Sequence, residues 1–533
     1  MTDAVAAQPG RLPRQIPYII GNEGCERFSF YGMRNILVPF LVSSILLAYL
    51  PESMREGAAK DIFHIFVIGV YFFPLLGGWI SDRFFGKYNT VFWLSLVYVG
   101  GHACLALFED SRAGFFTGLF LIALGSGGIK PLVSAFVGDQ FDRSNKHLAK
   151  VVYDAFYWII NFGSFFASLL MPIFLREYGP SVAFGIPGLL MAVATVIFWA
   201  GRKKYVHVPP APSNPHSFLR VVRTALSSPG QGRAGLMVAG IGVVLAMCSL
   251  ASLFWVIASA ESASAAAANG VIAVLVALGL LIAFGGMGAS MQLERARGVH
   301  PDEAVDGARA VLRILIVFAL VTPFWSLFDQ KASTWVLQGQ EMAKPDWFSA
   351  AQMQALNPVL VMLLIPFNNL VLYPVLRRMG FEVTALRRMG AGIAFSGVAW
   401  VAAGALQVWM DGGDVVSITW QVLPYALLTM GEVLVSATGL EFAYSQAPQT
   451  MKGVIMSFWL LSVSYGNLWV LLTNAAVRNE AVTAQIAATG LSETAFLMFF
   501  FAIFAFVAAA VFAWYARRYP VQDHYRAVDG GVA

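Results

Sequence analysis

Long apolar runs follow one another along nearly the whole chain, separated by short polar segments. Each run holds about 20 residues, the length at which a helix crosses the hydrocarbon core of a bilayer. Transmembrane strands would instead show short segments of alternating apolar and polar residues. The pattern therefore predicts an all-α polytopic membrane protein with 14 transmembrane helices. The predicted spans are 17–48, 62–81, 88–108, 114–138, 150–175, 181–201, 233–259, 267–291, 310–337, 350–377, 388–409, 416–440, 453–477 and 487–516.

The regular spacing of apolar runs is interrupted in the middle of the chain. This interruption predicts the domain organisation. Residues 202–232 are basic and rich in Pro and Ser, as is typical of a linker. Two spans without an intramembrane charge follow, and then a second basic loop, 292–309. We expect six spans, an inserted pair and six more spans, the two-half plan of many secondary transporters. The predicted parts are a six-helix bundle over 1–201, a linker with a peripheral helix pair over 202–309, a second six-helix bundle over 310–517 and a cytoplasmic tail over 518–533.

The composition supports lipid as the solvent of this chain. Of its 533 residues, 58% are hydrophobic and only 12% are charged, whereas a soluble protein carries roughly 25% charged residues. The three cysteines, Cys25, Cys104 and Cys248, are far apart and show neither metal-ligand spacing nor a disulfide framework. Residues 1–16 contain no separate apolar region with a cleavage site, so no cleaved signal peptide is expected.

The basic residues predict the orientation. With the N-terminus inside the cell, 25 of the 35 Lys and Arg residues lie in cytoplasmic segments, and only 7 lie on the opposite side. Such asymmetry favours cytoplasmic N- and C-termini. It also explains the net charge of +5 without a nucleic-acid partner. The seven residues assigned to the opposite side are Arg55, Lys60, Arg112, Arg176, Lys331, Lys344 and Arg478.

Charges inside the spans are the strongest functional signal. A charge at the bilayer centre costs roughly 2.5–3.5 kcal/mol even on insertion scales. The first span nevertheless carries four, and Glu23, Arg27 and Arg34 share one helical stripe with Tyr31 between them. We expect this stripe to face a polar cavity or paired partners. Structural contacts between helices, or a position nearer the membrane edge, remain the alternative. The four charged residues are Glu23, Glu26, Arg27 and Arg34.

Three later spans each carry one charge: Lys130, Asp329 and Glu432. Together with the first span, this makes three cations and four anions, a near balance that indicates pairs. Burial favours the neutral form of a carboxylate, so the extra carboxylate is the natural proton carrier. Pairs between the two halves would open and close as the halves rock.

Other polar and aromatic residues in the spans are weaker candidates. Asn161 and Asn357 need partners in hydrocarbon, and contacts between helices explain them equally well. His64 titrates near physiological pH in its unperturbed form, so it is either a proton relay or a buried hydrogen-bonding residue. The aromatic candidates, for which simple packing is the alternative, are Tyr31, Tyr71, Trp325 and Trp459.

Several motifs match a known family. The segment Glu23-Gly-Cys-Glu26-Arg27-Phe-Ser-Phe-Tyr31-Gly32 resembles the ExxERFxYYG motif of the proton-dependent oligopeptide transporter (POT/PTR) family. Gly77-Gly-Trp-Ile-Ser-Asp82-Arg83-Phe-Phe-Gly86-Lys87 is similar to a loop motif of the wider major facilitator superfamily. Further similar stretches are 138–141, 157–163, 324–331 and 431–436, and the inserted pair resembles prokaryotic members.

The resemblance implies a major facilitator fold and a proton-coupled symporter that imports di- and tripeptides by alternating access. It implies a multi-pass protein of the bacterial inner membrane that works as a monomer, without a cofactor, on the proton gradient. By resemblance, the proton-coupling residues are Glu23, Glu26, Arg27 and His64. The peptide-binding residues are Tyr31, Arg34, Tyr71, Lys130, Asn161, Trp325, Asn357, Glu432, Ser436 and Trp459. Arg34–Asp329 and Lys130–Glu432 resemble the outer and inner gate pairs.

The sequence departs from the family pattern at two positions, and three rival functions remain. Phe30 stands where the motif has its first Tyr, which removes a hydroxyl, and Asp329 stands where many members have Glu. The nearest rival is a proton-coupled carrier of another small anion or a drug-like solute. An enzyme is disfavoured because the chain has no HExxH or GxSxG motif, and a channel because it has no filter-like repeat.

Overall fold

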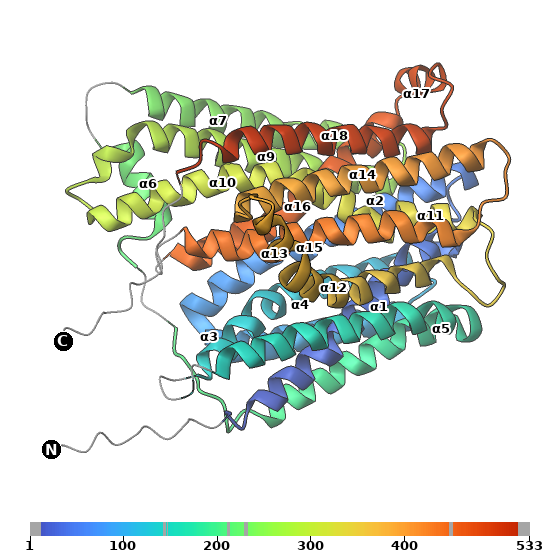
Figure 1. Ribbon diagram of the computed structural model, residues 1–533, viewed down its shortest axis with the longest axis horizontal. Helices are drawn as coiled ribbons and strands as arrows, with labels where there is room; N and C mark the ends of the chain where they lie inside the picture. Colours follow the sequence, from blue (N-terminus) through green and yellow to red (C-terminus); the bar gives the residue numbers. More distant parts are fainter. Residues whose placement is uncertain are drawn as a thin grey trace.

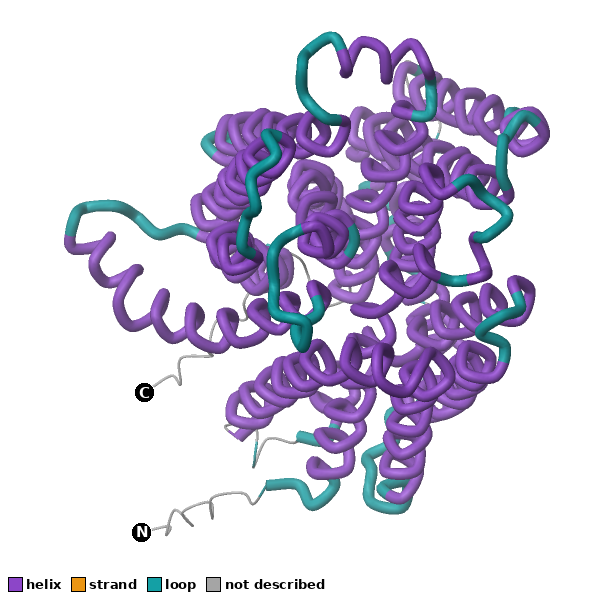
Figure 2. Tube along the Cα trace, turned by 90° about the vertical axis from the view of Figure 1, so that its right-hand side faces the viewer, coloured by secondary structure: helices purple, strands orange, loops and turns teal. Residues whose placement is uncertain are grey.

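The computed structural model describes residues 12–141, 145, 148–210, 214–228, 233–446 and 451–520. These residues form helices joined by loops and contain no strand (Figure 2). Most helices run along the long axis of the molecule (Figure 1). Both described chain ends lie at the same end of the bundle, on the left of Figure 1, which we call the terminal end. The opposite end, which holds the loop after α1 and the short helix α17, is the distal end.

The described residues of the first half contain five α-helices and two short helical turns. The last of them, α5, is two helices joined at Gly179, whose φ of 82° lies in the left-handed region that favours glycine. Pro180 follows and has no N–H to continue the first helix. The bounds are α1 Ile16–Ser43, α2 Glu52–Ile80, α3 Gly86–Leu107, α4 Arg112–Asp139 and α5 Ala149–Ala200.

The middle segment holds the inserted pair and one helix that the sequence did not predict. That helix, α6 (Phe218–Ser227), lies inside the predicted linker and buries Phe218, Val221 and Ala225 against the core of the second half. The other helices are α7 Ala234–Ala251, α8 Leu253–Ala258 and α9 Ala263–Gln292. Residues 211–213 and 229–232 of the predicted linker, and 521–533 of the predicted tail, lie outside the described residues.

The second half is more interrupted than predicted. The span 310–337 is broken by a 3-10 turn at Gln330–Ala332, so Asp329 ends a helix instead of lying within one. The span 350–377 is broken by a π-helical turn at Asn368–Leu372. The bounds are α10 Asp302–Asp329, α11 Thr334–Glu341, α12 Leu356–Phe367, α13 Tyr373–Arg378, α14 Ala385–Asp411, α15 Val422–Ser445, α16 Lys452–Val477, α17 Glu480–Ala487 and α18 Glu493–Ala516.

Eleven helical stretches of the described chain are long and apolar enough to cross a membrane. Two of them, Glu52–Leu107 and Val151–Ala200, each contain two of the predicted spans. Helix α1, with its four charges, is not among the eleven. The predicted all-helical class is confirmed, and the exact count of 14 stays a prediction.

The inserted pair meets the two halves where they touch each other. Helix α2 of the first half packs along α16 of the second, and α9 packs against both. Ile68 of α2, Leu275 of α9 and Leu471 of α16 share one apolar cluster. The Tyr465 hydroxyl of α16 also donates a 2.9 Å hydrogen bond to the Leu275 carbonyl. Helix α9 therefore contacts both halves, although only 17% of its apolar stretch is buried, and the peripheral position of the pair stays a prediction.

Candidate functional site

Helix α1 carries its charges along one face, as the spacing predicts. Arg27 lies 2.6 Å from Glu23 and 3.3 Å from Glu26, so one guanidinium serves two fully buried carboxylates. Both carboxylate oxygens of Glu26 lack a hydrogen-bond partner among the described residues. A buried carboxylate left in this way is costly, so the nearby Arg27 charge is its main stabilising contact among the described residues. Glu23, Glu26 and Arg27 form a group that we call the trio.

Lys130 lies beside the trio, and its ammonium contacts aromatic rings. Its Nζ is 3.5 Å from the centroid of Phe30 and 5.1 Å from that of Tyr71. An aromatic face attracts a cation through its quadrupole. Phe30 therefore does more than remove a hydroxyl, because it supplies a ring face to this ammonium. Phe30 also packs edge-to-face on Tyr31, with ring centroids 5.3 Å apart.

The predicted pair between Lys130 and Glu432 is not formed. Both residues are described, and no ion pair joins them. Glu432 instead accepts a 2.5 Å hydrogen bond from the Asn357 amide, which also donates to Thr429. An inner gate of Lys130 and Glu432 therefore stays a prediction for another conformation.

The predicted outer pair is present at the distal side of the site. Arg34 of α1 donates a 2.6 Å hydrogen bond to Asp329 at the end of α10, and both side chains are buried. The other Asp329 oxygen accepts a 2.7 Å bond from Asn467 of α16. This ion pair joins the two halves directly, and its role as a gate stays a prediction.

His64 of α2 extends the same network. Its Nδ1 lies 2.6 Å from the Asn467 side-chain oxygen, and its Nε2 lies 3.1 Å from the Ser333 hydroxyl. His64, Asn467, Asp329 and Arg34 thus form one continuous chain of hydrogen bonds between the halves, which we call the distal network. Both ring nitrogens of His64 have hydrogen-bond partners, as expected of a buried hydrogen-bonding residue, and its role as a proton relay stays a prediction.

Two aromatic residues form one wall on the second half. The rings of Trp325 and Trp459 meet edge-to-face with centroids 5.8 Å apart. Trp325 sits over Gly466, where a Cβ would come within 2.4 Å of the Trp325 Cβ, so the glycine makes room for the indole. The Trp325 indole N–H has no acceptor among the described residues. Ser436 lies one helical turn after Glu432 on α15, on the same face.

Asn161 does not reach Glu432 in this structure. Its amide donates to the Tyr157 carbonyl in its own helix. Tyr157 itself is 43% exposed. A contact of Asn161 with a peptide therefore stays a prediction.

Sequence reasoning missed several residues of the site. Asn467 is an Asn within an apolar span, the signal that identified Asn161 and Asn357, and could have been found in the same way. Lys331, assigned to a loop, is buried with its Nζ 3.4 Å from the Phe328 ring centroid. Asp61 of α2 binds Arg478 and Asn474 of the second half, a further contact between the halves.

Metal ligands do not cluster in the part of the chain that the structure describes: no group of three or more His, Cys, Asp or Glu residues could hold an ion. The candidate site thus consists of charged, amide and aromatic side chains from both halves.

Comparison with known proteins identifies the family. Residues 88–489 match the model of the POT family. A crystal structure of an auto-inhibited POT family peptide transporter is 67% identical, with a TM-score of 0.92, and the alignment covers 97% of this chain and 99% of that one. The structure of the POT family transporter PepTSo is 64% identical, with a TM-score of 0.91, over 97% and 100% of the two chains.

Curated relatives agree with these structures. Peptide transporter 3 of Caenorhabditis elegans is 31% identical over 74% of this chain and 51% of its own length. The chain thus spans about half the length of the curated relatives it matches. These relatives are transporters and not enzymes. The resemblance seen in the motifs is confirmed, and this chain belongs to the POT family.

Proposed function

We propose that this protein is a proton-coupled symporter that imports di- and tripeptides across the bacterial inner membrane by alternating access. The observation that carries the proposal is the distal network, in which Arg34 and Asp329 pair across the two halves at 2.6 Å. Ionised groups in a membrane domain are costly unless they are paired or line a substrate path. These groups pair between two bodies that must move apart for substrate to enter from the distal side.

Charged residues in the distal network and elsewhere in the site suit a zwitterionic peptide. Arg34 and Lys130 would meet the peptide carboxylate, and Glu432 with Asn357 would meet the amino terminus. Because Asn357 already bonds to Glu432, the acid is oriented before substrate arrives. The rings of Tyr31, Tyr71, Trp325 and Trp459 would contact peptide side chains. Two fixed charged ends restrict peptide length, while aromatic walls tolerate many side chains.

Proton coupling would rest on the trio of Glu23, Glu26 and Arg27. Two carboxylates share one guanidinium, so protonation of one removes an excess negative charge. The Lys130 charge acts on the same carboxylates, which would link the protonation state to the peptide-binding cation. The protein would need no cofactor, because the proton gradient supplies the driving force. We further propose that it works as a monomer with both termini in the cytoplasm.

The test is uptake into proteoliposomes with and without an inwardly directed proton gradient. Labelled dialanine and trialanine should accumulate only with the gradient, and each should displace the other. Nitrate, tetra-alanine and free alanine should neither accumulate nor compete. Accumulation of nitrate or a drug-like solute in place of dialanine would establish the rival carrier, and uptake that ignores the gradient would refute the coupling.

A further inference from the structure

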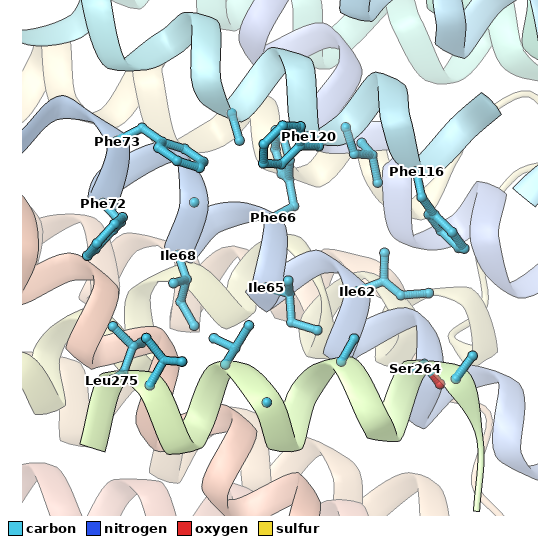
Figure 3. Close-up of a pocket in the computed structure, with 18 of the residues that line it drawn as sticks. Ile62, Ile65, Phe66, Ile68, Phe72, Phe73, Phe116, Phe120, Ser264 and Leu275 are labelled. Atoms are coloured by element: carbon cyan, nitrogen blue, oxygen red, sulfur yellow. The ribbon is translucent and has the colours of Figure 1, made fainter. Parts of the chain in front are cut away.

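A cavity lies outside the charged site. It has a volume of about 520 Å³ and is enclosed by α2, α4 and the inserted helix α9. Figure 3 shows Phe116 and Phe120 of α4 on one side, Ile65 and Phe72 of α2 in the middle, and Leu275 of α9 opposite. None of the peptide or proton residues lines it. Its walls are almost entirely carbon, so its occupant is apolar over most of its length.

The length of this groove matches half of a bilayer. Its lining runs from Ile62 to Phe73 on α2 and from Ala263 to Leu275 on α9. At 1.5 Å per residue these stretches are about 17–18 Å long. The hydrocarbon core is roughly 30 Å thick, so one leaflet offers about 15 Å. A single acyl chain that starts at the distal surface would therefore fill the groove.

One end of the groove is cationic. Arg112 is the first residue of α4, at the distal end, and its guanidinium lies 4.0 Å from the ring centroid of Tyr49. No ion pair joins Arg112 to a described residue. Glu109 and Asp110 precede it but do not line the groove. A cation at the mouth of an apolar channel of leaflet length complements an anionic headgroup followed by an acyl chain.

We propose that this groove binds one phospholipid of the distal leaflet, with its phosphate at Arg112 and an acyl chain between α2, α4 and α9. The acyl chain would contact protein on three sides, whereas an ordinary boundary lipid contacts only one face of a membrane protein. It fills the space between α4 and α9, while Tyr465 ties α9 to α16 on the other side. The bound lipid thereby supports the inserted pair at the contact between the halves. This proposal is independent of the substrate that the protein carries.

Native mass spectrometry of the detergent-purified protein tests the proposal. The probes are dioleoyl phosphatidylglycerol and dioleoylglycerol, which has the same chains and no phosphate. We expect the wild type to retain one phosphatidylglycerol and to bind dioleoylglycerol about tenfold more weakly, because the latter lacks a charge-assisted contact. Equal binding of the two probes, or no lipid retained above the level of random adducts, would overturn the proposal.

Variants locate the lipid. Ala267 of α9 is exposed and lines the groove, so Ala267→Phe fills it from one side. The matched control is Ala405→Phe, an exposed alanine of α14 outside the groove. We expect retention to fall about tenfold in the first variant only, since the acyl chain loses its apolar contacts. Val274→Trp serves the same purpose if Ala267→Phe does not fold. Equal retention by a folded groove variant and its control would exclude this site.

The headgroup contact has its own variant. Arg112→Gln removes the charge at the mouth of the groove, and Arg176→Gln removes another exposed distal arginine as the control. Phosphatidylglycerol should bind about tenfold more weakly to Arg112→Gln alone, while binding of dioleoylglycerol stays unchanged. Wild-type phosphatidylglycerol binding by Arg112→Gln would show that the phosphate lies elsewhere and would overturn the assignment.

Discussion

The two charged regions of this protein differ in how far their polar groups are satisfied. In the distal network, Asp329 receives bonds from Arg34 and Asn467, and His64 uses both ring nitrogens. In the trio on α1, both oxygens of Glu26 lack a hydrogen-bond partner among the described residues, although the Arg27 guanidinium lies 3.3 Å away. The first region connects the halves, whereas the second lies within one half. The difference teaches that the distal network holds the two halves together in this structure, while the trio is the region that the proposed function assigns to proton binding.

The largest effect should come from the unsatisfied region. Glu26→Gln replaces the carboxylate with a group that cannot exchange a proton. We expect gradient-driven dialanine uptake to fall to the background of empty liposomes, while exchange of labelled for unlabelled dialanine continues. The measurement is uptake and counterflow on the same preparation, with Glu177→Gln, an exposed carboxylate, as the control. Accumulation at the wild-type level would disprove the coupling role.

Lys130→Ala should have the next largest effect. The ammonium is held by rings in this structure, so under the proposed function its loss would remove a peptide contact without breaking an ion pair. A hydrogen bond to a charged group contributes about 1.5–3 kcal/mol, which corresponds to a roughly tenfold to hundredfold rise in KM for dialanine. Lys203→Ala, at an exposed lysine, is the control. An unchanged KM would contradict the peptide-binding role of Lys130.

The charged residues of the site also show how much of it can be predicted from the sequence. The charges in apolar spans predicted only that cations and anions pair, because a lone charge in lipid is costly. The family resemblance named the partners, and the structure forms the Arg34–Asp329 pair but not the Lys130–Glu432 pair. Sign and burial restrict the set of partners, but the conformation decides which of them meet. A ring face as the partner of Lys130 could not be predicted from charge counting.

The fold shows the same limit of prediction from the sequence. Apolar runs predicted the helical class, because hydrocarbon requires internal hydrogen bonds. They did not predict the 3-10 turn at Gln330–Ala332, which places Asp329 at a helix end and buries Lys331. Nor did they predict α6, whose apolar stripe is short and lies in a segment with linker composition. The position of α9 across α2 and α16 depends on shape complementarity, for which a single sequence gives no signal.

Asn467→Ala should weaken the distal network by a smaller amount. It removes the bridge between Asp329 and His64 and leaves polar groups of both without a partner. The loss of such a buried bond costs about 1–3 kcal/mol, which would raise the population of a form open at the distal end roughly tenfold or more. Spin-label distances across the distal end measure this population, and Asn89→Ala, at an exposed asparagine that donates to the nearby Phe85 carbonyl, is the control. Unchanged distances would show that the bridge does not hold the halves together.

Tyr465→Phe should have the smallest effect. It removes only the hydroxyl that bonds to the Leu275 carbonyl of α9, a contribution of about 0.5–1.5 kcal/mol. We expect faster amide hydrogen exchange in α9 and uptake reduced by no more than a few fold. Tyr178→Phe, at an exposed tyrosine, should change neither. Wild-type exchange in α9 would show that α9 is held by apolar packing alone.

The central claim is that the Arg34–Asp329 pair keeps the distal end closed. Double electron–electron resonance tests it with labels at Glu52→Cys on α2 and Glu480→Cys on α17, both exposed distal positions in different halves, after Cys25, Cys104 and Cys248 are replaced. Asp329→Asn leaves Arg34 as an unpaired buried charge, a cost of about 3–5 kcal/mol. We predict one short distance in the wild type and a second, longer distance in Asp329→Asn, but not in the control Asp110→Asn. Identical distance distributions in the wild type and Asp329→Asn would contradict the account.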